Sequence, residues 1–421
     1  MWETLKNAWK IPDLRKKILY TLMMLVIYRL MCFVPVPGVD KATVAARLAS
    51  SGVSGLLDFI GTMTGSQMSD FAIMAMGITP YINASIIMQL LAVAIPKLEE
   101  MQKEGEEGRK KIAKITRYVT IGLGFLQATA LSISLRAAVN GAWYSYIEIG
   151  LCLAAGTALA MWIGERINEN GIGNGVSLLI FAGIISRISM QIVGYIRSAA
   201  AGVSPIWHFV PVLVISLAMI VGVTLVDLAE RRIPVQYAKR MVGRKLYGGQ
   251  STHIPLKVNA SGVLPLIFAS AIMQFPSIIM SLFGENNRAL TWWNKYFAYT
   301  SGWYLIVFAV LVFAFTFFYS SITFNPVDIS KRIQENGGLI PGIRQGKPTA
   351  DFIAKITRRI TLFGALFLAV LAILPTLLYN ILGISIPLAA SSLLIAVSVA
   401  IETVRQLESQ MTLRHYKGFL K

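Results

Sequence analysis

Cysteine, histidine and charge are all scarce in this sequence of 421 residues. The two cysteines, Cys32 and Cys152, both lie inside apolar runs, and two are too few for a disulfide framework or a four-ligand zinc site. His208, His253 and His415 are the only histidines, which leaves few candidates for acid–base catalysis. The sequence contains no Walker A loop, no H-E-x-x-H and no supported Ser-His-Asp set. We therefore expect no catalytic residue, no metal and no cofactor.

Charged residues make up only 14% of the chain, whereas 55% of residues are hydrophobic and the mean hydropathy is +0.62. A bilayer core about 30 Å thick needs about 20 apolar residues per helix. Ten runs of that length predict an all-α polytopic membrane protein. They are Ile18–Val34, Phe71–Ile95, Ile115–Leu135, Tyr144–Ile163, Val176–Ile196, Phe209–Leu228, Val263–Phe283, Tyr304–Phe324, Ile360–Asn380 and Ile386–Val404.

The charges that are present are unbalanced, with 39 Lys and Arg against 21 Asp and Glu, a net charge of +18. Ten crossings place both termini on one side, and 31 of the 39 basic residues fall on that side, counting Arg117 at the edge of the third span. Six fall on the other side, and Arg29 and Arg187 fall within spans. Because basic residues accumulate in cytoplasmic loops, both termini are expected in the cytoplasm.

Acidic residues are missing from the middle of the predicted spans. Glu148, Asp227 and Glu402 lie near span ends. Ion-coupled transporters usually keep charged residues near the bilayer midplane. A secondary transporter for a small solute is therefore the weaker alternative to a passive conduit, and a membrane hydrolase would need a catalytic set that is absent. For Arg29 and Arg187 we expect snorkelling or pairing rather than a substrate role.

The second, seventh and tenth spans are too polar for full exposure to lipid. Small and hydroxylated residues suit close helix packing, and composition alone favours packing over the lining of a pathway. Ten spans divide into five and five, an odd number per half, which predicts two inverted halves that meet near the midplane. We assign residues 18–200 to the first half and 201–404 to the second.

Several segments outside the spans carry recognisable features. Residues 1–17 are expected to form an amphipathic helix on the inner leaflet, and residues 405–421 a cytoplasmic tail. The loops 229–259 and 325–359 are large and basic, with a β-like stretch at Ile233–Tyr237 in the first. Asn325-Pro326 and Asn336-Gly337-Gly338 predict the start and end of a helix in the second, and a further helix is expected after Pro348. Two basic protrusions suggest docking onto an acidic or RNA-rich partner.

Long strings of residues resemble the SecY family, the central subunits of protein-conducting channels. The resemblance extends over essentially the whole chain. It rests on Gly77-Ile78-Thr79-Pro80-Tyr81-Ile82-Asn83-Ala84-Ser85, Lys103-Glu104-Gly105, Gly171-Ile172-Gly173-Asn174-Gly175, Gln250-Ser251-Thr252-His253-Ile254-Pro255-Leu256-Lys257-Val258-Asn259, Phe324-Asn325-Pro326 and Pro341-Gly342-Ile343-Arg344.

The resemblance implies an hourglass channel of the bacterial plasma membrane. Such a channel translocates unfolded preproteins and releases transmembrane segments sideways into lipid. An apolar constriction ring is implied at Ile78, Ile82, Val176, Ile180, Ile267 and Ile395. A collar of branched apolar side chains can dewet and seal against ions. For these positions the resemblance reverses the preference for packing over pore lining.

The resemblance also assigns a plug, a lateral gate and a docking surface. The plug is expected at about residues 57–68, with Leu57, Phe59, Ile60 and Met63. The gate is expected to use Gln89, Gln127 and Asn259, and docking Arg344, Arg231, Arg232, Arg244 and Lys245. The implied partners are small membrane subunits resembling SecE and SecG, the SecA motor ATPase, the ribosome with its rRNA, preproteins with their signal peptides, and membrane lipids.

Overall fold

The chain divides into two compact units, which are described separately. One unit comprises Met1–Phe209, Ala271–Tyr304 and Pro387–Lys421, and the other Val210–Ser270 and Leu305–Ile386. The division into two inverted five-helix halves remains a prediction of topology. The computed structural model describes residues 6, 8–44, 71–200, 209–237, 240–242, 245–247, 251–282, 292–293, 296–297, 301–382 and 390–418.

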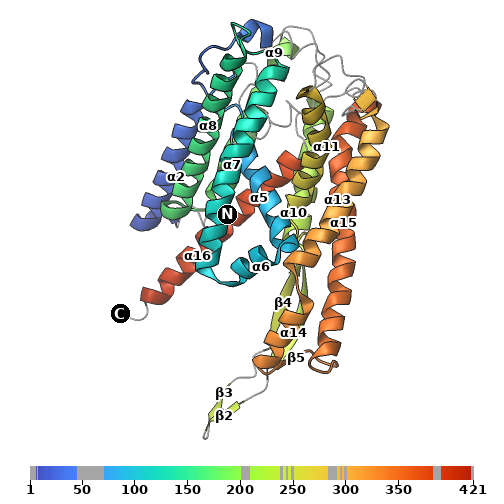
Figure 1. Ribbon diagram of the computed structural model, residues 1–421. Coiled ribbons are helices and arrows are strands. Elements are labelled where there is room, and N and C mark those ends of the chain that lie inside the picture. The colour runs from blue at the N-terminus through green and yellow to red at the C-terminus, as the bar shows by residue number, and fades with distance from the viewer. Residues whose placement is uncertain are drawn as a thin grey trace. The chain divides into compact units, whose positions relative to one another are not determined.

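The first unit is a group of packed helices (Figure 1). Helix α7 packs against α5 and α8, α8 also packs against α2 and α9, and α16 packs against α9. Small side chains let these helices approach closely, as expected for helices in lipid. The helices are α2 Pro12–Met31, α5 Thr79–Ala94, α6 Pro96–Lys103, α7 Glu106–Ser134, α8 Trp143–Asn170, α9 Gly175–Ala200 and α16 Ala390–Gly418.

The second predicted span is shorter as a helix than the sequence suggested. Residues 71–73 do not start a helix, because the Val36 N–H donates to the Phe71 carbonyl at 2.9 Å and the Ile73 N–H to the Val34 carbonyl at 2.9 Å. The α5 helix begins only at Thr79, with Pro80 in its first turn. At Ile95 the backbone becomes extended before Pro96, as expected for a residue that precedes proline. The chain therefore bends by 106° between α5 and α6.

Each of the ten predicted spans overlaps a helix, so the helical assignments are confirmed at the level of element type. By length and composition, four helices among the described residues could cross a membrane, or five if the bent pair α5 and α6 is one span. Two shorter apolar helices, at Leu213–Leu228 and Leu264–Met273, add to these. The count of ten crossings stays a prediction.

The turn between α8 and α9 contains glycines at positions where a side chain would not fit. A Cβ atom at Gly175 would overlap the Gly164 carbonyl, so glycine is required there by close approach. The Gly175 N–H donates to the Asn168 side chain at 2.7 Å. The Ile172 N–H donates to the Thr21 hydroxyl of α2 at 3.0 Å. This turn thus joins α2, α8 and α9 at their predicted cytoplasmic ends.

The N-terminal stretch packs on the same end of the first unit. Ala8, Leu14, Ile172 and Leu407 form one buried cluster, against which Met411 packs. Trp9 is exposed, as expected for a residue on an interfacial face. The α16 helix extends well past the predicted end of the tenth span, and this extension contributes Leu407 and Met411 to the cluster.

The second unit combines long helices with a small sheet at one end (Figure 1). Strand β1 pairs with β4 on one side and with β5 on the other, while β2 and β3 form a separate hairpin. The predicted β-like stretch at Ile233–Tyr237 is therefore confirmed within β1. The elements are α10 Phe209–Leu228, β1 Glu230–Tyr237, β2 Arg240–Val242, β3 Lys245–Tyr247, β4 Ser251–Lys257, α11 Leu264–Leu282 (in this unit up to Ser270), α13 Gly302–Thr323, α14 Pro326–Glu335, β5 Gly338–Leu339 and α15 Lys347–Leu382.

Two prolines lie on the edges of the sheet of β4, β1 and β5. Pro234 of β1 pairs with His253, and Pro255 of β4 pairs with Arg232. The Val258 N–H donates to the Ala229 carbonyl in the same register, so the hydrogen-bonded pairs are those at odd positions of β1. Both prolines therefore occupy non-hydrogen-bonded pairs. At Pro255 the N–H is therefore missing from the outer edge of β4. At Pro234 it is missing from the edge of β1 that faces β5, and β5 pairs with β1 only at residues 236–237.

Local signals explain the two helices that follow. Asn325 caps α14, since its side-chain oxygen accepts from the Val327 N–H at 3.1 Å and Pro326 stands in the first turn. The helix ends before Gly337, whose φ is 68°. Both predicted boundaries are confirmed. The further helix begins at Lys347, close to the predicted start, and continues without a break into the ninth span.

Candidate functional site

The loop between α14 and α15 ends in a tight, exposed turn. Pro341 and Gly342 are its central residues, Gly342 has a φ of 81°, and the Ile343 N–H donates to the Ile340 carbonyl at 3.1 Å. These features are those of a type II turn, which favours Pro at its second position and Gly at its third. Arg344 follows directly, and its side chain is exposed. The turn therefore presents a cation at the surface.

This turn is mounted on a small hydrophobic core that links the sheet to both helices. The cluster is formed by branched apolar side chains from β1, β4, α14, the loop and α15, namely Ile233, Val235, Leu256, Ile333, Ile340 and Ile353. Ile343 packs against it. Because Ile340 and Ile343 flank the turn, both of its ends are held by burial. The sheet, α14 and the start of α15 thus support one exposed tip, which is formed by the turn and Arg344.

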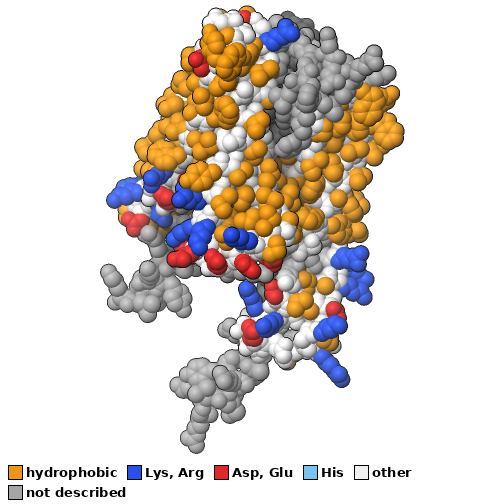
Figure 2. Space-filling model, in the orientation of Figure 1, with side chains coloured by type: hydrophobic (Ala, Val, Ile, Leu, Met, Phe, Trp, Pro, Cys, Tyr) orange, Lys and Arg blue, Asp and Glu red, His pale blue; other side chains and the backbone are white. Residues whose placement is uncertain are grey.

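The other predicted docking cations differ in their surroundings. Arg231 and Arg232 lie exposed on β1, but the Arg232 Nε is 2.8 Å from Glu230 Oε1, which partly neutralises it. Lys245 lies in β3, and Arg244 falls outside the described residues. Figure 2 shows Lys and Arg side chains of the second unit gathered at the end that carries the sheet, beside the hydrophobic surface of the helices. Within the described chain, no carboxylate lies within 4.0 Å of the Arg344 guanidinium.

The predicted ring residues lie near the starts of helices and are largely buried. Ile78 precedes α5 and is 1% exposed, and Ile82 follows one turn later, half-buried. Val176 and Ile180 are likewise one turn apart on α9. Ile395 on α16 and Ile267 on α11 are buried. Since α16 packs against α9, three of the six lie on adjoining helices; the closed ring itself stays a prediction.

The predicted gate residues each have a different set of contacts. Gln89 on α5 donates to the Ser85 hydroxyl at 3.4 Å, within its own helix. Gln127 is half-buried on α7. Asn259 is 6% exposed, and its Nδ2 donates to Asp227 Oδ1 at 3.3 Å. The polar cluster of all three stays a prediction.

Two buried oxygen atoms in these regions lack hydrogen bonds among the described residues. Asn259 Oδ1 accepts none, and the hydroxyl of Thr79 has no partner either. Buried polar atoms without partners are uncommon and costly, by about 1–3 kcal/mol each. Sequence reasoning noticed Thr79 only as a polar residue of the second span and gave it no role. The signal that could have identified it is its place beside Ile78 at the start of the helix.

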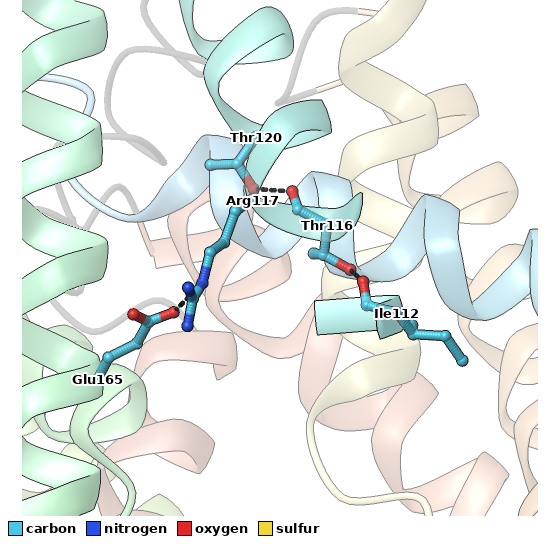
Figure 3. A network of polar contacts seen from close by, with 5 residues as sticks. All are labelled: Ile112, Thr116, Arg117, Thr120 and Glu165. Carbon is cyan, nitrogen blue, oxygen red and sulfur yellow. Dashed lines mark hydrogen bonds and ion pairs between the residues drawn. The ribbon is translucent and has the colours of Figure 1, made fainter. Parts of the chain in front are cut away.

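Charged side chains near the membrane boundary are paired between helices. The Arg117 Nε on α7 donates to Glu165 Oε1 on α8 at 2.7 Å, while the Thr116 and Thr120 hydroxyls donate to backbone carbonyls of α7 (Figure 3). Arg29, well inside the first predicted span, donates to the Ser186 hydroxyl of α9. We expected snorkelling or pairing with a helix end or a nearby carboxylate, whereas this partner is a hydroxyl group on a neighbouring helix.

Comparison with known proteins identifies the family. The SecY family model matches residues 72–404. Protein translocase subunit SecY of Thermotoga maritima is 43% identical, over 100% of this chain and 98% of that protein. The same subunit of Bacillus subtilis is also 43% identical, over 100% of both chains. This chain belongs to the SecY family. Members of the SecY family are translocase channel subunits, so the chain is a channel component and not an enzyme.

Solved structures share the fold of this SecY family member. A protein-conducting channel matches with a TM-score of 0.68 at 19% identity, over 94% of this chain and 92% of that chain. Sec61 in a canine ribosome-channel complex from the endoplasmic reticulum matches with a TM-score of 0.63 at 17% identity, over the same shares. The predicted class, a helical polytopic membrane protein, is confirmed, with the small sheets as an addition. The predicted plug residues Leu57, Phe59, Ile60 and Met63 lie outside the described residues.

Proposed function

We propose that this channel conducts unfolded preproteins across a bacterial plasma membrane, with both termini in the cytoplasm. We further propose that it opens sideways to release transmembrane segments and signal peptides into membrane lipids. A docked ribosome or SecA-like motor ATPase supplies the driving force, because the chain holds no nucleotide-binding loop of its own. The observation that carries the docking proposal is the exposed Arg344 on a supported turn.

The proposed pathway is closed at rest by an apolar collar and a plug. Ile78, Ile82, Val176, Ile180, Ile267 and Ile395 are the proposed collar. Their branched side chains repel water and offer a passing chain no strong hydrogen bond. The plug is proposed at about residues 57–68. Four of the six residues are buried near helix starts, and this supports the assignment because rigid backbone elements keep a constriction narrow.

The proposed lateral gate uses hydrogen bonds that can exchange. Asn259 Oδ1 and the Thr79 hydroxyl are buried, and among the described residues neither has a partner. We therefore add Thr79 to Gln89, Gln127 and Asn259 as a gate residue. Hydrogen bonds between membrane helices are worth about 1 kcal/mol each, so a gate of a few such bonds can open when a signal peptide inserts.

The partner surface is proposed to be basic and cytoplasmic. Arg344, Arg231, Arg232, Arg244 and Lys245 are the proposed contacts to the ribosome or the motor. Two solved structures of the same fold, the canine Sec61 complex and yeast Ssh1, are bound to ribosomes, which supports the ribosome as a partner here. Small membrane subunits resembling SecE and SecG complete the proposed assembly.

The docking proposal is tested by reversing the charge at the tip. Arg344→Glu should strongly reduce translocation of a preprotein into reconstituted vesicles, while the channel remains inserted and folded. Lys331→Glu on the exposed face of α14 makes the same charge change away from the tip and is the matched control. Unaltered transport by Arg344→Glu, or equal losses in both variants, would refute a specific role for the tip.

A further inference from the structure

We propose that Thr349 is a positioning residue for ribosome docking: its hydroxyl holds the backbone of Arg344 so that the guanidinium faces ribosomal RNA phosphates. The inference rests on the docking function proposed above. It assigns to the start of α15 a role beyond beginning a helix. Ser330 and Gln345 complete the frame that holds the loop.

Three side-chain hydrogen bonds tie the loop after the turn to its surroundings. The Thr349 hydroxyl donates to the Arg344 carbonyl at 2.7 Å, and Thr349 is only 3% exposed. The Ser330 hydroxyl of α14 donates to the Gly346 carbonyl at 2.8 Å. Gln345 Nε2 donates to the Gly338 carbonyl of β5 at 2.9 Å. The carbonyls on both sides of Gln345 are therefore fixed by buried or half-buried donors.

The direction of the Thr349 bond separates this role from ordinary helix capping. A capping hydroxyl accepts a hydrogen bond from a free N–H of the first turn. The Thr349 hydroxyl instead donates, and it donates backward to a loop carbonyl three residues before α15 begins. The first turn of α15 closes independently, because the Ala350 N–H donates to the Gly346 carbonyl at 3.1 Å. Thr349 thus stabilises the loop, not the helix end.

Fixing this backbone matters for binding because the positive charge of Arg344 is not neutralised by a neighbouring carboxylate. Within the described residues no carboxylate lies within 4.0 Å of its guanidinium, so the cation is available to an incoming anion. Arginine pairs with phosphate through two parallel hydrogen bonds, which demand a defined orientation. A loop that is ordered before binding loses less conformational entropy when it binds. A rigid frame and a free guanidinium together fit a phosphate-rich surface.

The test compares four variants of the full channel in nanodiscs, titrated with purified empty ribosomes at several salt concentrations. Thr349→Val removes the donor at nearly constant volume, and Thr349→Ser keeps it. Thr357→Val makes the same change two turns along α15, where the buried hydroxyl has no hydrogen bond among the described residues. Arg344→Ala removes the cation itself.

Thr349→Val should weaken ribosome affinity about fivefold, the factor that one net hydrogen bond is worth. Its salt dependence should match the wild type, because no cation is lost, whereas Arg344→Ala should lower the slope of log affinity against log salt by about one. Thr349→Ser should restore affinity, and Thr357→Val should not change it. A nitroxide label at position 344 should become more mobile in Thr349→Val, while the melting temperature should fall by only a few degrees, as expected for the loss of one hydrogen bond in a large protein.

Different results identify which idea fails. If Arg344→Ala weakens binding and Thr349→Val does not, the positioning role is wrong and docking stands. If neither variant changes ribosome affinity, the docking proposal fails as well. A loss for Thr349→Val that Thr349→Ser does not restore would show a packing effect and would overturn the positioning role. Weakened binding to the motor ATPase alone would overturn the choice of ribosomal RNA as the ligand.

Discussion

Replacing Asn259 with Leu is expected to shift the gate toward its open state. The substitution keeps the branched shape of this buried side chain and removes both its polar atoms. The hydrogen bond from Nδ2 to Asp227 lies within one compact unit, so it is present whether the gate is open or closed. Its loss therefore affects both states equally and does not change the equilibrium between them. Only the hydrogen bond that Oδ1 is proposed to accept in the closed gate changes the equilibrium between open and closed states.

The size of the effect follows from that single bond. One hydrogen bond between membrane helices is worth about 1 kcal/mol. Since 1.4 kcal/mol corresponds to a tenfold change in an equilibrium constant, the open fraction should rise about fivefold. The direction is toward opening, because the closed state alone loses the bond. In Asn259→Leu the unpartnered buried oxygen is also absent, which prevents any new cost in the open state.

The assay is the translocation of a preprotein with a defective signal sequence, relative to one with an intact sequence, into reconstituted vesicles. A channel that opens more easily should discriminate less, so the ratio should rise about fivefold. Ser270→Ala is the matched control, because the Ser270 hydroxyl is buried and donates within its own helix, to the Ile267 carbonyl at 2.8 Å. An unchanged ratio in a folded Asn259→Leu channel would show that Oδ1 accepts no hydrogen bond across the gate.

Two further substitutions test the ring and the packing. Ile82→Ser should raise resting ion conductance in planar bilayers, because a hydroxyl wets an apolar constriction, and Val310→Ser on the exposed face of α13 should not. Equal conductance in the wild type and Ile82→Ser would remove Ile82 from the collar. Gly175→Ala should destabilise the channel by about 1–3 kcal/mol in thermal unfolding, since its Cβ would overlap the Gly164 carbonyl. Gly194→Ala has open space on the same helix, so a similar loss there would contradict this explanation.

Much of the helical architecture could be predicted because the bilayer imposes a length on each apolar run. Local sequence signals also predicted α14. Asn325 and Pro326 indicated its start, and Gly337 indicated its end. The exception was the start of the second span. Apolar residues near Phe71 suggested a helix, but an isolated bridge between Ala72 and Pro35 keeps them out of a helical conformation. Such pairing between distant segments leaves no periodic signal.

The candidate site was only partly predictable for the same reason. Arg344 could be found from its motif, yet the Thr349 hydroxyl that holds its carbonyl has a role visible only in the direction of a hydrogen bond. Asn259 could be proposed for the gate, but its pairing with Asp227 joins residues that are 32 positions apart. A sequence shows which polar groups exist. Which of them are left without partners depends on the packed structure.

The prolines on the sheet edges have a consequence for a channel whose cargo is unfolded. An open strand edge presents N–H and C=O groups to which any extended polypeptide can add as another strand. Pro234 and Pro255 each remove a donor on one of the two free edges. An emerging or arriving client chain therefore meets a sheet that offers it a poor template for pairing. The sheet that supports the proposed docking tip can therefore lie beside a translocating chain without pairing with it.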